Sequence, residues 1–378
     1  MNIKIKREPF AVALASAFSI IEPKSIIRLW ECFYFELNKD SLNIYSRSSL
    51  LQMKLYQKVE SQDVGTFVVP ASTLFETVRL LKCEEIELSV EESDAGVIIN
   101  LQAVGRKKNY KIASYRPDEF SIEKHENIEG EKVLSSGILK EILTTSSNFI
   151  KNEELRKICT GVSLRNDKNG DLEFAATNGF LMSRHVVKGL DISIDPCVIP
   201  RKSCVAISNL RDEGDVRIFR KGSYFVFTDG YIEISTLLID FDEGYPDISV
   251  FWEKEYKSDH YIMINKIELI DAMKILNVYS NSKHRLAEFH LGPDYLRLKA
   301  EPESKNSVAE ETISCVNTGH FGFVAGYNVM SLSMILNSIE GDNVKIHFCG
   351  EKKPAFIEEE QENNNGVSKS FLIQAIAI

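Results

Sequence analysis

Three stretches of the chain repeat one pattern, and this repetition limits the fold more than any other feature of the sequence. The stretches "VVPASTLFETVRLL" (68–81), "VIPRKSCVAISNL" (198–210) and "NVMSLSMILNSI" (328–339) each read as a strand end followed by a helix. Proline is favoured in the first turn of a helix and asparagine just before it, so Pro70, Pro200 and Asn328 mark the helix starts. Their spacings, 130 and 128 residues, are too long for a solenoid repeat. Each copy is therefore expected to be a whole domain.

The residues that follow each anchor keep the same register. Four positions after each anchor stands Leu74, Cys204 or Leu332. Sixteen positions on stand Ile86, Val216 and Val344, and eighteen positions on stand Leu88, Ile218 and Ile346. The residue between these last two positions is charged in each copy: Glu87, Arg217 and Lys345. This alternation is typical of a half-buried strand. Apolar-spaced helices are also expected at 10–20, 138–150 and 267–279. The pattern predicts an α+β protein of three tandem similar domains, 1–122, 130–250 and 251–378, each with two helices packed on antiparallel sheets.

Composition narrows the class of protein. The 378 residues are 44% hydrophobic and 26% charged, as in ordinary folded domains, and the net charge is -10. Apolar runs are shorter than a membrane span requires and the N-terminus lacks the apolar block of a secretory signal, so we expect a cytoplasmic protein with no membrane contact. Seven scattered cysteines without a CxxC pair indicate reduced core thiols. The acidic balance argues against a simple basic nucleic-acid binder.

The sequence carries no recognisable catalytic motif. Its seven histidines are dispersed, and no HExxH, nucleophile elbow or phosphate-binding glycine loop is present. We therefore expect no catalytic residue, no metal and no cofactor. A catalytic site assembled from distant residues is the less favoured alternative.

The order of several motifs resembles one protein family over essentially the whole chain. These are "VVPASTLFETVRLL", "ELRKICTGVSL" (154–164), "FAATNGFLMSRHVV" (174–187), "VIPRK", "STLLIDFDEGYPDISVF" (235–251) and "FLIQAIAI" (371–378). The family is the bacterial sliding clamp, the β subunit of DNA polymerase III. The resemblance implies a processivity factor: a head-to-tail homodimer forms a six-domain ring that encircles double-stranded DNA without sequence readout. Because the ring would hold DNA by enclosing it and not by binding it tightly, a net negative charge is compatible with this function.

The resemblance also implies which groups serve the ring. Basic residues on or near the expected helices would face DNA: Lys24, Arg79, Lys82, Lys151, Arg156, Lys157, Arg201 and Lys202, with Lys274, Lys283 and Arg285 in the third domain. The alternative is that they are solvated surface charges paired with Glu76, Glu153, Glu154 and Asp271.

Polymerase and clamp loader would bind through short hydrophobic peptide motifs. By resemblance, the pocket for these peptides comprises Cys159, Thr177, Gly179, Met182, Pro246, Phe251, Leu372, Ile376 and Ile378. The chain departs from the family where Asn178, Gly179, Phe180 and Leu181 replace Asp-Gly-His-Arg, where Ala375, Ala377 and Ile378 replace the usual Pro and Arg-Leu ending, and where Phe251 is bulkier than the usual residue. These departures put in question which peptides bind and whether the chain is the main replicative clamp or a divergent second copy.

The ring requires an interface between first and third domains. The segment 106–115 reads as an edge strand with Tyr110 and Ile112 alternating inward, and its partner by resemblance is the helix end at Val278 and Tyr279. Two alternatives stay open: an ordinary protected edge, and a three-domain scaffold that binds proteins without encircling DNA. A clamp would be cytoplasmic and associated with the nucleoid when loaded.

Overall fold

We describe the protein from a computed structural model. It describes all residues except 94–95, 106–108, 125–130, 152–155, 191, 240–243, 253–257, 303–306, 320–321 and 361–365. The chain forms two compact units. The first comprises Met1–Glu141 and Lys202–Leu238, and the second comprises Ile142–Arg201 and Ile239–Ile378.

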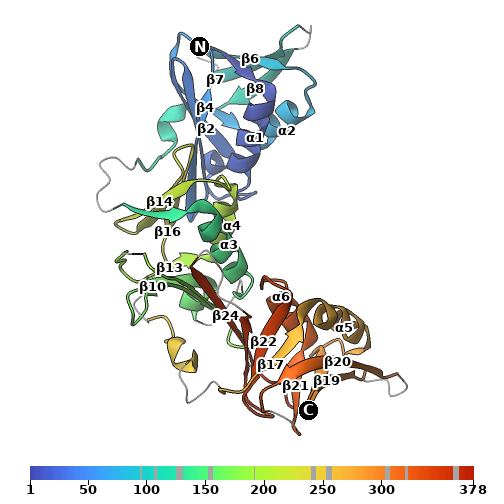
Figure 1. Ribbon diagram of the computed structural model, residues 1–378. Helices are drawn as coiled ribbons and strands as arrows, with labels where there is room; N and C mark the ends of the chain where they lie inside the picture. Colours follow the sequence, from blue (N-terminus) through green and yellow to red (C-terminus); the bar gives the residue numbers. More distant parts are fainter. Residues whose placement is uncertain are drawn as a thin grey trace. The chain divides into compact units, whose positions relative to one another are not determined.

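One order of elements runs through the chain three times: strand, helix, four strands, helix, three strands (Figure 1). The first copy comprises β1 (Asn2–Lys6), α1 (Arg7–Phe18), β2 (Cys32–Asn38), β3 (Ser41–Arg47), β4 (Leu51–Lys58), β5 (Val64–Pro70), α2 (Ala71–Leu80), β6 (Glu85–Ser93), β7 (Gly96–Ala103) and β8 (Asn109–Ser114).

The second copy comprises β9 (Lys132–Ser135), α3 (Ser136–Ser147), β10 (Gly161–Asn166), β11 (Leu172–Thr177), β12 (Leu181–Val187), β13 (Cys197–Pro200), α4 (Arg201–Ala206), β14 (Asp215–Lys221), β15 (Tyr224–Thr228) and β16 (Ile232–Leu237). The third comprises β17 (Ile262–Asn265), α5 (Lys266–Tyr279), β18 (Leu286–Leu291), β19 (Tyr295–Ala300), β20 (Ala309–Asn317), β21 (Val324–Asn328), α6 (Val329–Leu336), β22 (Asn343–Phe348), β23 (Ala355–Glu359) and β24 (Val367–Ile373). The expected α+β class and threefold repeat are confirmed.

Strand pairing joins the copies into continuous antiparallel sheets. In the first unit, β4 pairs with β16, which gives one sheet of order β5-β2-β3-β4-β16-β15-β14-β9 beside a smaller sheet, β1-β6-β7-β8. In the second unit, β12 pairs with β24 in a sheet of order β13-β10-β11-β12-β24-β23-β22-β17-β20-β19-β18-β21. The middle copy thus gives half of its strands to each unit, which explains why the chain packs as two units although its elements repeat three times.

The apolar residues that recur at the same positions of each copy are buried, as their spacing predicts. Leu74 of α2 and Cys204 of α4 are fully buried, and Leu332 of α6 is buried as well. On the strands that follow, the apolar residues at both alternate positions are buried. Helices α1 and α2 lie side by side on one face of the first unit, as do α5 and α6 in the second (Figure 1). Each helix pair therefore covers a sheet with its apolar face, the arrangement that buries most apolar surface.

The seven cysteines are free thiols, four of them buried. Burial raises the pKa of the Cys32 thiol to about 12, so this residue stays protonated and unreactive in the folded chain. In the described part of the chain, no three metal-binding side chains come together at a metal site. No helix in the described ranges is long and apolar enough to cross a membrane.

Candidate functional site

Three residues of the sequence-predicted pocket form one row across the sheet of the second unit. Thr177 on β11 lies opposite Met182 on β12, and Met182 lies opposite Leu372 on β24. Directly opposed residues of antiparallel strands project from the same face, so the three side chains share one face of the sheet. The row crosses the join between the middle and third copies of the repeat.

The segment 244–252 contributes two further predicted residues, Pro246 and Phe251. Its Tyr245 hydroxyl donates to the Ala175 carbonyl at 3.3 Å, and burial raises the pKa of that hydroxyl. Tyr245 also packs against the buried cluster of Ile158, Cys159 and Val198. Cys159 and Pro246 are thus held near the same strands by the partly buried Tyr245.

The carboxylate of Glu173 lies on the same face of β11 as Thr177 and is buried. Glu173 is 0% exposed and accepts hydrogen bonds from Arg165 Nε at 2.7 Å and Arg184 Nε at 2.5 Å. Arg165 also reaches Asp247 of the segment 244–252 at 3.2 Å. The guanidinium of Arg184 lies 5.9 Å from the ring centre of Trp252. This network connects strands β10, β11 and β12 to the segment that carries the predicted pocket residues.

The turn between β11 and β12 displays an aromatic side chain. Asn178 Oδ1 accepts from the amides of Phe180 at 3.0 Å and Leu181 at 2.8 Å, and Gly179 takes a φ of 86° that favours glycine. Phe180 is consequently 63% exposed, with the Lys151 ammonium 5.1 Å from its ring centre. The family departure at this turn thus places an apolar ring at the surface.

Beside this turn lies a groove of about 430 Å³, which we call the tail groove because the C-terminal tail forms one wall. It is lined by Asn178, Phe180, Leu181, Lys283, His284, Asn328, Ser331, Ile373, Gln374, Ala375 and Ile376. Of the nine predicted pocket residues, only Ile376 lines this groove. Thr177, Met182 and Leu372 lie on the strands and Gly179 in the turn between β11 and β12. Cys159 lies in the helical turn Lys157–Thr160, Pro246 and Phe251 lie on the segment 244–252, and Ile378 is exposed at the terminus. Lys283 and Asn328 are predicted from the sequence in other roles, as a DNA-facing cation and a helix start, and His284 and Ser331 are not predicted at all, because these residues join the groove only through tertiary packing.

Seven of the eight DNA-facing cations predicted in the first two domains fall into two groups, and the eighth, Lys151, lies over the ring of Phe180. Arg79 pairs with Glu76 at 2.5 Å and Lys202 with Glu22 at 2.6 Å, while Arg201 Nε donates to the Ser147 carbonyl at 2.8 Å. Lys202 holds the pKa of the Glu22 carboxyl below its usual value. Lys24, Lys82, Arg156 and Lys157 are exposed and have no salt-bridge partner among the described residues. Glu153 and Glu154, expected as partners, lie outside the described residues.

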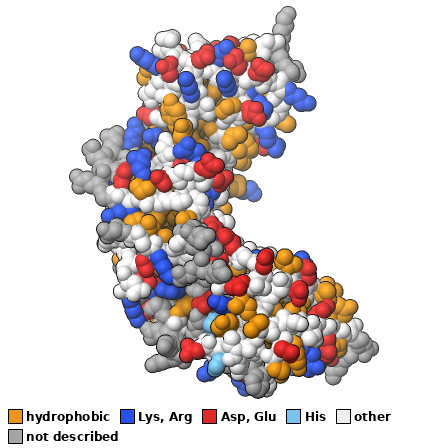
Figure 2. Space-filling view, viewed as in Figure 1, with side chains coloured by type: hydrophobic (Ala, Val, Ile, Leu, Met, Phe, Trp, Pro, Cys, Tyr) orange, Lys and Arg blue, Asp and Glu red, His pale blue; other side chains and the backbone are white. Residues whose placement is uncertain are grey.

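The structure places the predicted interface residues at an edge strand and a helix surface. β8 lies at the end of its sheet, with Ile112 buried and Tyr110 half-buried. Val278 on α5 is 79% exposed and Ile275, one turn earlier, is also exposed. Figure 2 shows hydrophobic side chains at the surface over this part of the second unit. The three basic residues 106–108 lie outside the described residues.

Comparisons with known proteins bear on the whole chain. Residues 1–123 match the model for the N-terminal domain of the DNA polymerase III beta subunit, and residues 256–371 match the model for its C-terminal domain. Together these segments make up more than half of the chain. The chain belongs to the bacterial sliding clamp family.

Relatives support this assignment over nearly the full length. The beta sliding clamp of Staphylococcus aureus is 19% identical, with 94% of each chain covered, and that of Staphylococcus epidermidis is 20% identical, with 96% of this chain and 97% of the relative covered. The fold is similar to the Pseudomonas aeruginosa clamp bound to griselimycin, with 18% identity, a TM-score of 0.89 and full coverage of both chains. The Caulobacter crescentus clamp is 17% identical with a TM-score of 0.89, covering 100% of this chain and 99% of that one. The chain is thus a processivity subunit and not an enzyme.

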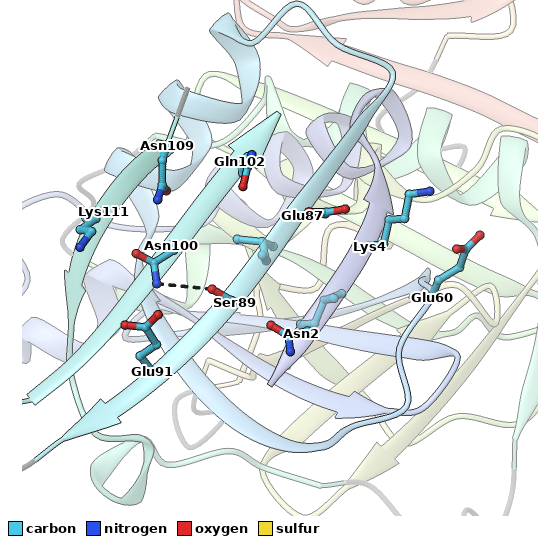
Figure 3. A pocket seen from close by; sticks show the side chains of 12 residues that line it. Asn2, Lys4, Glu60, Glu87, Ser89, Glu91, Asn100, Gln102, Asn109 and Lys111 are labelled. Carbon is cyan, nitrogen blue, oxygen red and sulfur yellow. Dashed lines mark hydrogen bonds between the residues drawn. The ribbon is translucent and has the colours of Figure 1, made fainter. Parts of the chain in front are cut away.

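This clamp also has a polar hollow of about 490 Å³ on the outer face of the sheet β1-β6-β7-β8 (Figure 3). Ser89 and Asn100 lie in its centre, joined by a hydrogen bond of 3.4 Å, and Lys111 of β8 lies at its rim. The opposite face of the sheet carries the apolar core residues, so this face is the one left to solvent. Its lining combines the amide side chains of Asn2, Asn100, Gln102 and Asn109 with the charged side chains of Lys4, Glu60, Glu87, Glu91 and Lys111.

Proposed function

We propose that this clamp closes head to tail with a second copy into a ring of six domains, 1–122, 130–250 and 251–378 from each chain. The ring encircles double-stranded DNA without reading its sequence and tethers DNA polymerase and the clamp loader through short hydrophobic peptides. Its place is the cytoplasm, on the nucleoid when loaded. One observation carries the proposal: the strand pairing that joins the three copies leaves one unpaired strand edge at each end of the series.

The pairing follows a fixed rule. The fourth strand of the first copy, β4, pairs with β16, the last strand of the second copy. The corresponding strand of the second copy, β12, pairs with β24, the last strand of the third. By the same rule β20 of the third copy requires β8, the last strand of a first copy. A repeated head-to-tail interface closes into a ring when its rotation closes. In that ring the β8 strand that pairs with β20 of one chain belongs to the other chain.

Both edges are available for this pairing. Within the described residues, β8 pairs only with β7. The N-terminal part of β20, residues 309–314, pairs with β19 on one side, whereas β17 pairs only with residues 315–317. The edges also have opposite charges, because Lys111 is exposed on β8 and Glu310 on β20. Val278 and Ile275 of α5 supply exposed apolar surface at the same end of the third copy. The sequence did not indicate β20 as the partner strand.

Retention on DNA of different topology tests the proposal. The clamp, placed on a nicked plasmid by its own loader and ATP, should elute with the circle in gel filtration. Cutting the plasmid once should release it, because enclosure holds the clamp and a linear molecule has open ends. Equal retention on circle and linear DNA would instead support a scaffold that binds without encircling, and absence of a dimer in solution would also favour that alternative.

The helices contribute little positive charge to any DNA-facing surface. Within the described residues, the α-helices α1 to α6 carry seven cationic against five acidic side chains, a net charge of +2, and the excess lies at Arg201 and Lys202 of α4. Both of these groups already have partners in the chain. We infer that the phosphates are contacted chiefly by the loop cations Lys24, Lys82, Arg156 and Lys157, and weakly, as sliding requires.

We therefore expect a shallow salt dependence for binding to a short duplex, which a single substitution should change measurably. Each phosphate contact adds a slope of about 0.9 to the dependence of log K on log salt. The Lys24→Gln variant should lose about one contact, and the slope should fall by about 0.9. Arg79→Gln is the matched control, since Arg79 is already paired with Glu76. Fluorescence anisotropy at several salt concentrations measures both slopes, and an equal fall for both variants would contradict the assignment to loop cations.

Peptide binding is assigned to the tail groove together with the adjoining row of Thr177, Met182 and Leu372. The groove combines five apolar residues, Phe180, Leu181, Ile373, Ala375 and Ile376, with six polar ones, which suits an extended peptide with leucine or aromatic anchors and a hydrogen-bonding backbone. The Caulobacter crescentus clamp carries polyethylene glycol in the region assigned to tethering of the beta motif, which supports a binding region of this kind. Whether this chain serves as the main clamp or a second copy depends on which peptides the groove accepts.

A further inference from the structure

We propose that the first copy of the repeat carries a second binding groove, far from the C-terminal tail, which the other chain of the ring completes. The inference rests on the proposed head-to-tail ring and goes beyond it, because a site shared by two chains exists only when the ring is closed. Its occupant is a short extended segment of a partner protein with an apolar anchor and one acidic residue. We call this site the first-copy groove.

The first-copy groove is a cavity of about 880 Å³ within the first unit. Its walls are the loop between α1 and β2, which carries Lys24 and Arg28, the start of α2 with Pro70 and Thr73, and Tyr115, the residue after β8. Half of its 12 described lining residues are apolar. The cavity therefore has the size and the mixed lining that suit a side chain of a ligand together with its polar backbone.

The threefold repeat places this groove where the third copy has the tail groove. Pro70 and Asn328 are equivalent helix starts, and each lines the groove of its own copy. Three positions on, Thr73 and Ser331 do the same. In both copies the remaining lining includes the loop after the first helix and the segment that follows the last strand. The two grooves thus use the same elements of one repeated unit, although their side chains differ.

One wall of the tail groove comes from a neighbouring copy. Phe180, which precedes β12 of the second copy, forms this wall beside the end of β24, the strand that pairs with β12. By the same pairing rule the neighbour of β8 is β20 of the other chain, and the residue that precedes β20 is Val308. Val308 is 47% exposed in the single chain. In the proposed ring, Val308 of the partner subunit is therefore the apolar wall that completes the first-copy groove.

The loop 19–31, which forms the opposite wall, is held in place by its own contacts. The Ser25 amide donates to Glu31 Oε1 at 2.8 Å. At the base of the loop the ring of Phe18 stacks on that of Phe75 of α2, with 5.0 Å between the ring centres. The shape of this wall is thus preset, so little order is lost when a ligand binds.

The charge of the first-copy groove favours a ligand with one carboxylate. Among its described lining residues, Lys24 and Arg28 are cationic and Glu31 is acidic, which leaves a net charge of +1. Both cations are exposed, and in the described part of the chain neither forms a salt bridge. A single surplus cation is complementary to a peptide with one acidic residue. It is too little for a nucleic-acid strand, whose binding requires several phosphate contacts.

Photocrosslinking of the full-length protein tests the inference. The probe is a short peptide with one leucine, one aspartate and the photoreactive residue benzoylphenylalanine. In the wild-type dimer it should label two places, near Ile376 in the tail groove and near Tyr115 in the first-copy groove, which mass spectrometry of the digested protein distinguishes. The monomeric Val278→Glu variant should keep the label near Ile376 and lose about five-fold of the label near Tyr115, because the apolar contact with the partner's Val308 is missing.

Two further substitutions test the wall and the charge separately. Val308→Ser should leave the protein a dimer in light scattering and lower the label near Tyr115 by about five-fold. Arg28→Gln should lower it by about three-fold, the effect of one exposed ion pair. Arg79→Gln is the matched control for charge, since Arg79 lies in the same copy and is already paired with Glu76, and it should leave the label unchanged.

The outcomes that contradict the inference are distinct from those that contradict the ring. A dimer that is labelled only near Ile376, or whose label near Tyr115 is unaffected by Val308→Ser and Val278→Glu, would overturn the inference and leave the ring intact. A wild-type protein that stays monomeric in light scattering would overturn the ring itself and the shared groove with it. Loss of the label near Tyr115 on addition of oligo-dT, with the label near Ile376 retained, would assign the groove to single-stranded nucleic acid and overturn the peptide assignment.

Discussion

The Val278→Glu variant is expected to be a monomer of 42.9 kDa in solution and to be lost from circular DNA as fast as from linear DNA. Val278 is 79% exposed in the single chain, so the substitution leaves the fold intact. In the proposed ring the same position lies in an apolar contact next to the pairing of β20 with β8. Burying a carboxylate there without a partner costs several kcal/mol, about enough to abolish a dimer of micromolar affinity.

Multi-angle light scattering gives the mass, and the nicked-plasmid assay gives the retention. Val133→Glu is the matched control, since Val133 on β9 is also an exposed valine, 49% accessible, but lies at the sheet edge of another copy. The control should remain a dimer. A Val278→Glu protein that still dimerises and still slides only off cut DNA would show that α5 is not part of the ring contact.

The Glu173→Ala variant is expected to lower the free energy of unfolding of the second unit by about 3 kcal/mol. The substitution leaves two half-buried guanidinium groups, Arg165 and Arg184, without the carboxylate that both contact. It also removes the anchor through which Arg165 positions Asp247. The cost is at the lower end for a broken buried pair because both arginines retain some access to water and Arg184 keeps Asp167 at 3.5 Å.

Urea unfolding followed by the emission of Trp252 measures this change, because that ring lies near Arg184 in the same unit. A Trp30→Phe background removes the signal of the other tryptophan. Asp271→Ala is the comparison, since Asp271 pairs with Lys274 in the same unit but is 61% exposed, and its loss should change stability by less than about 1 kcal/mol. Similar midpoints for Glu173→Ala and Asp271→Ala would mean that the buried network does not hold the unit together.

The site is less readable from the sequence than the fold. The residues Thr177, Met182 and Leu372 were assigned together by resemblance, and the register of β11, β12 and β24 does bring them into one row. Of the residues that line the tail groove, only Ile376 is predicted from the sequence as a pocket residue. It is built from four segments, 178–181, 283–284, 328–331 and 373–376, that are far apart in the sequence. Local patterns contain no information about such a meeting of segments.

The sequence by itself determined the repeated helix starts at Pro70, Pro200 and Asn328, the buried faces of the strands that follow, and hence the α+β class. These features depend on residue type and spacing over a few turns of chain, which the local sequence records. Only the tertiary structure decided that β4 joins β16 and that β12 joins β24. Among the described residues, it also left one edge of β8 and one edge of residues 309–314 of β20 without a partner strand. It also decided that Lys202 is paired with Glu22 while Lys24 is not. Backbone hydrogen bonds between strands are the same for every residue, so the choice of partner strand depends on long-range packing.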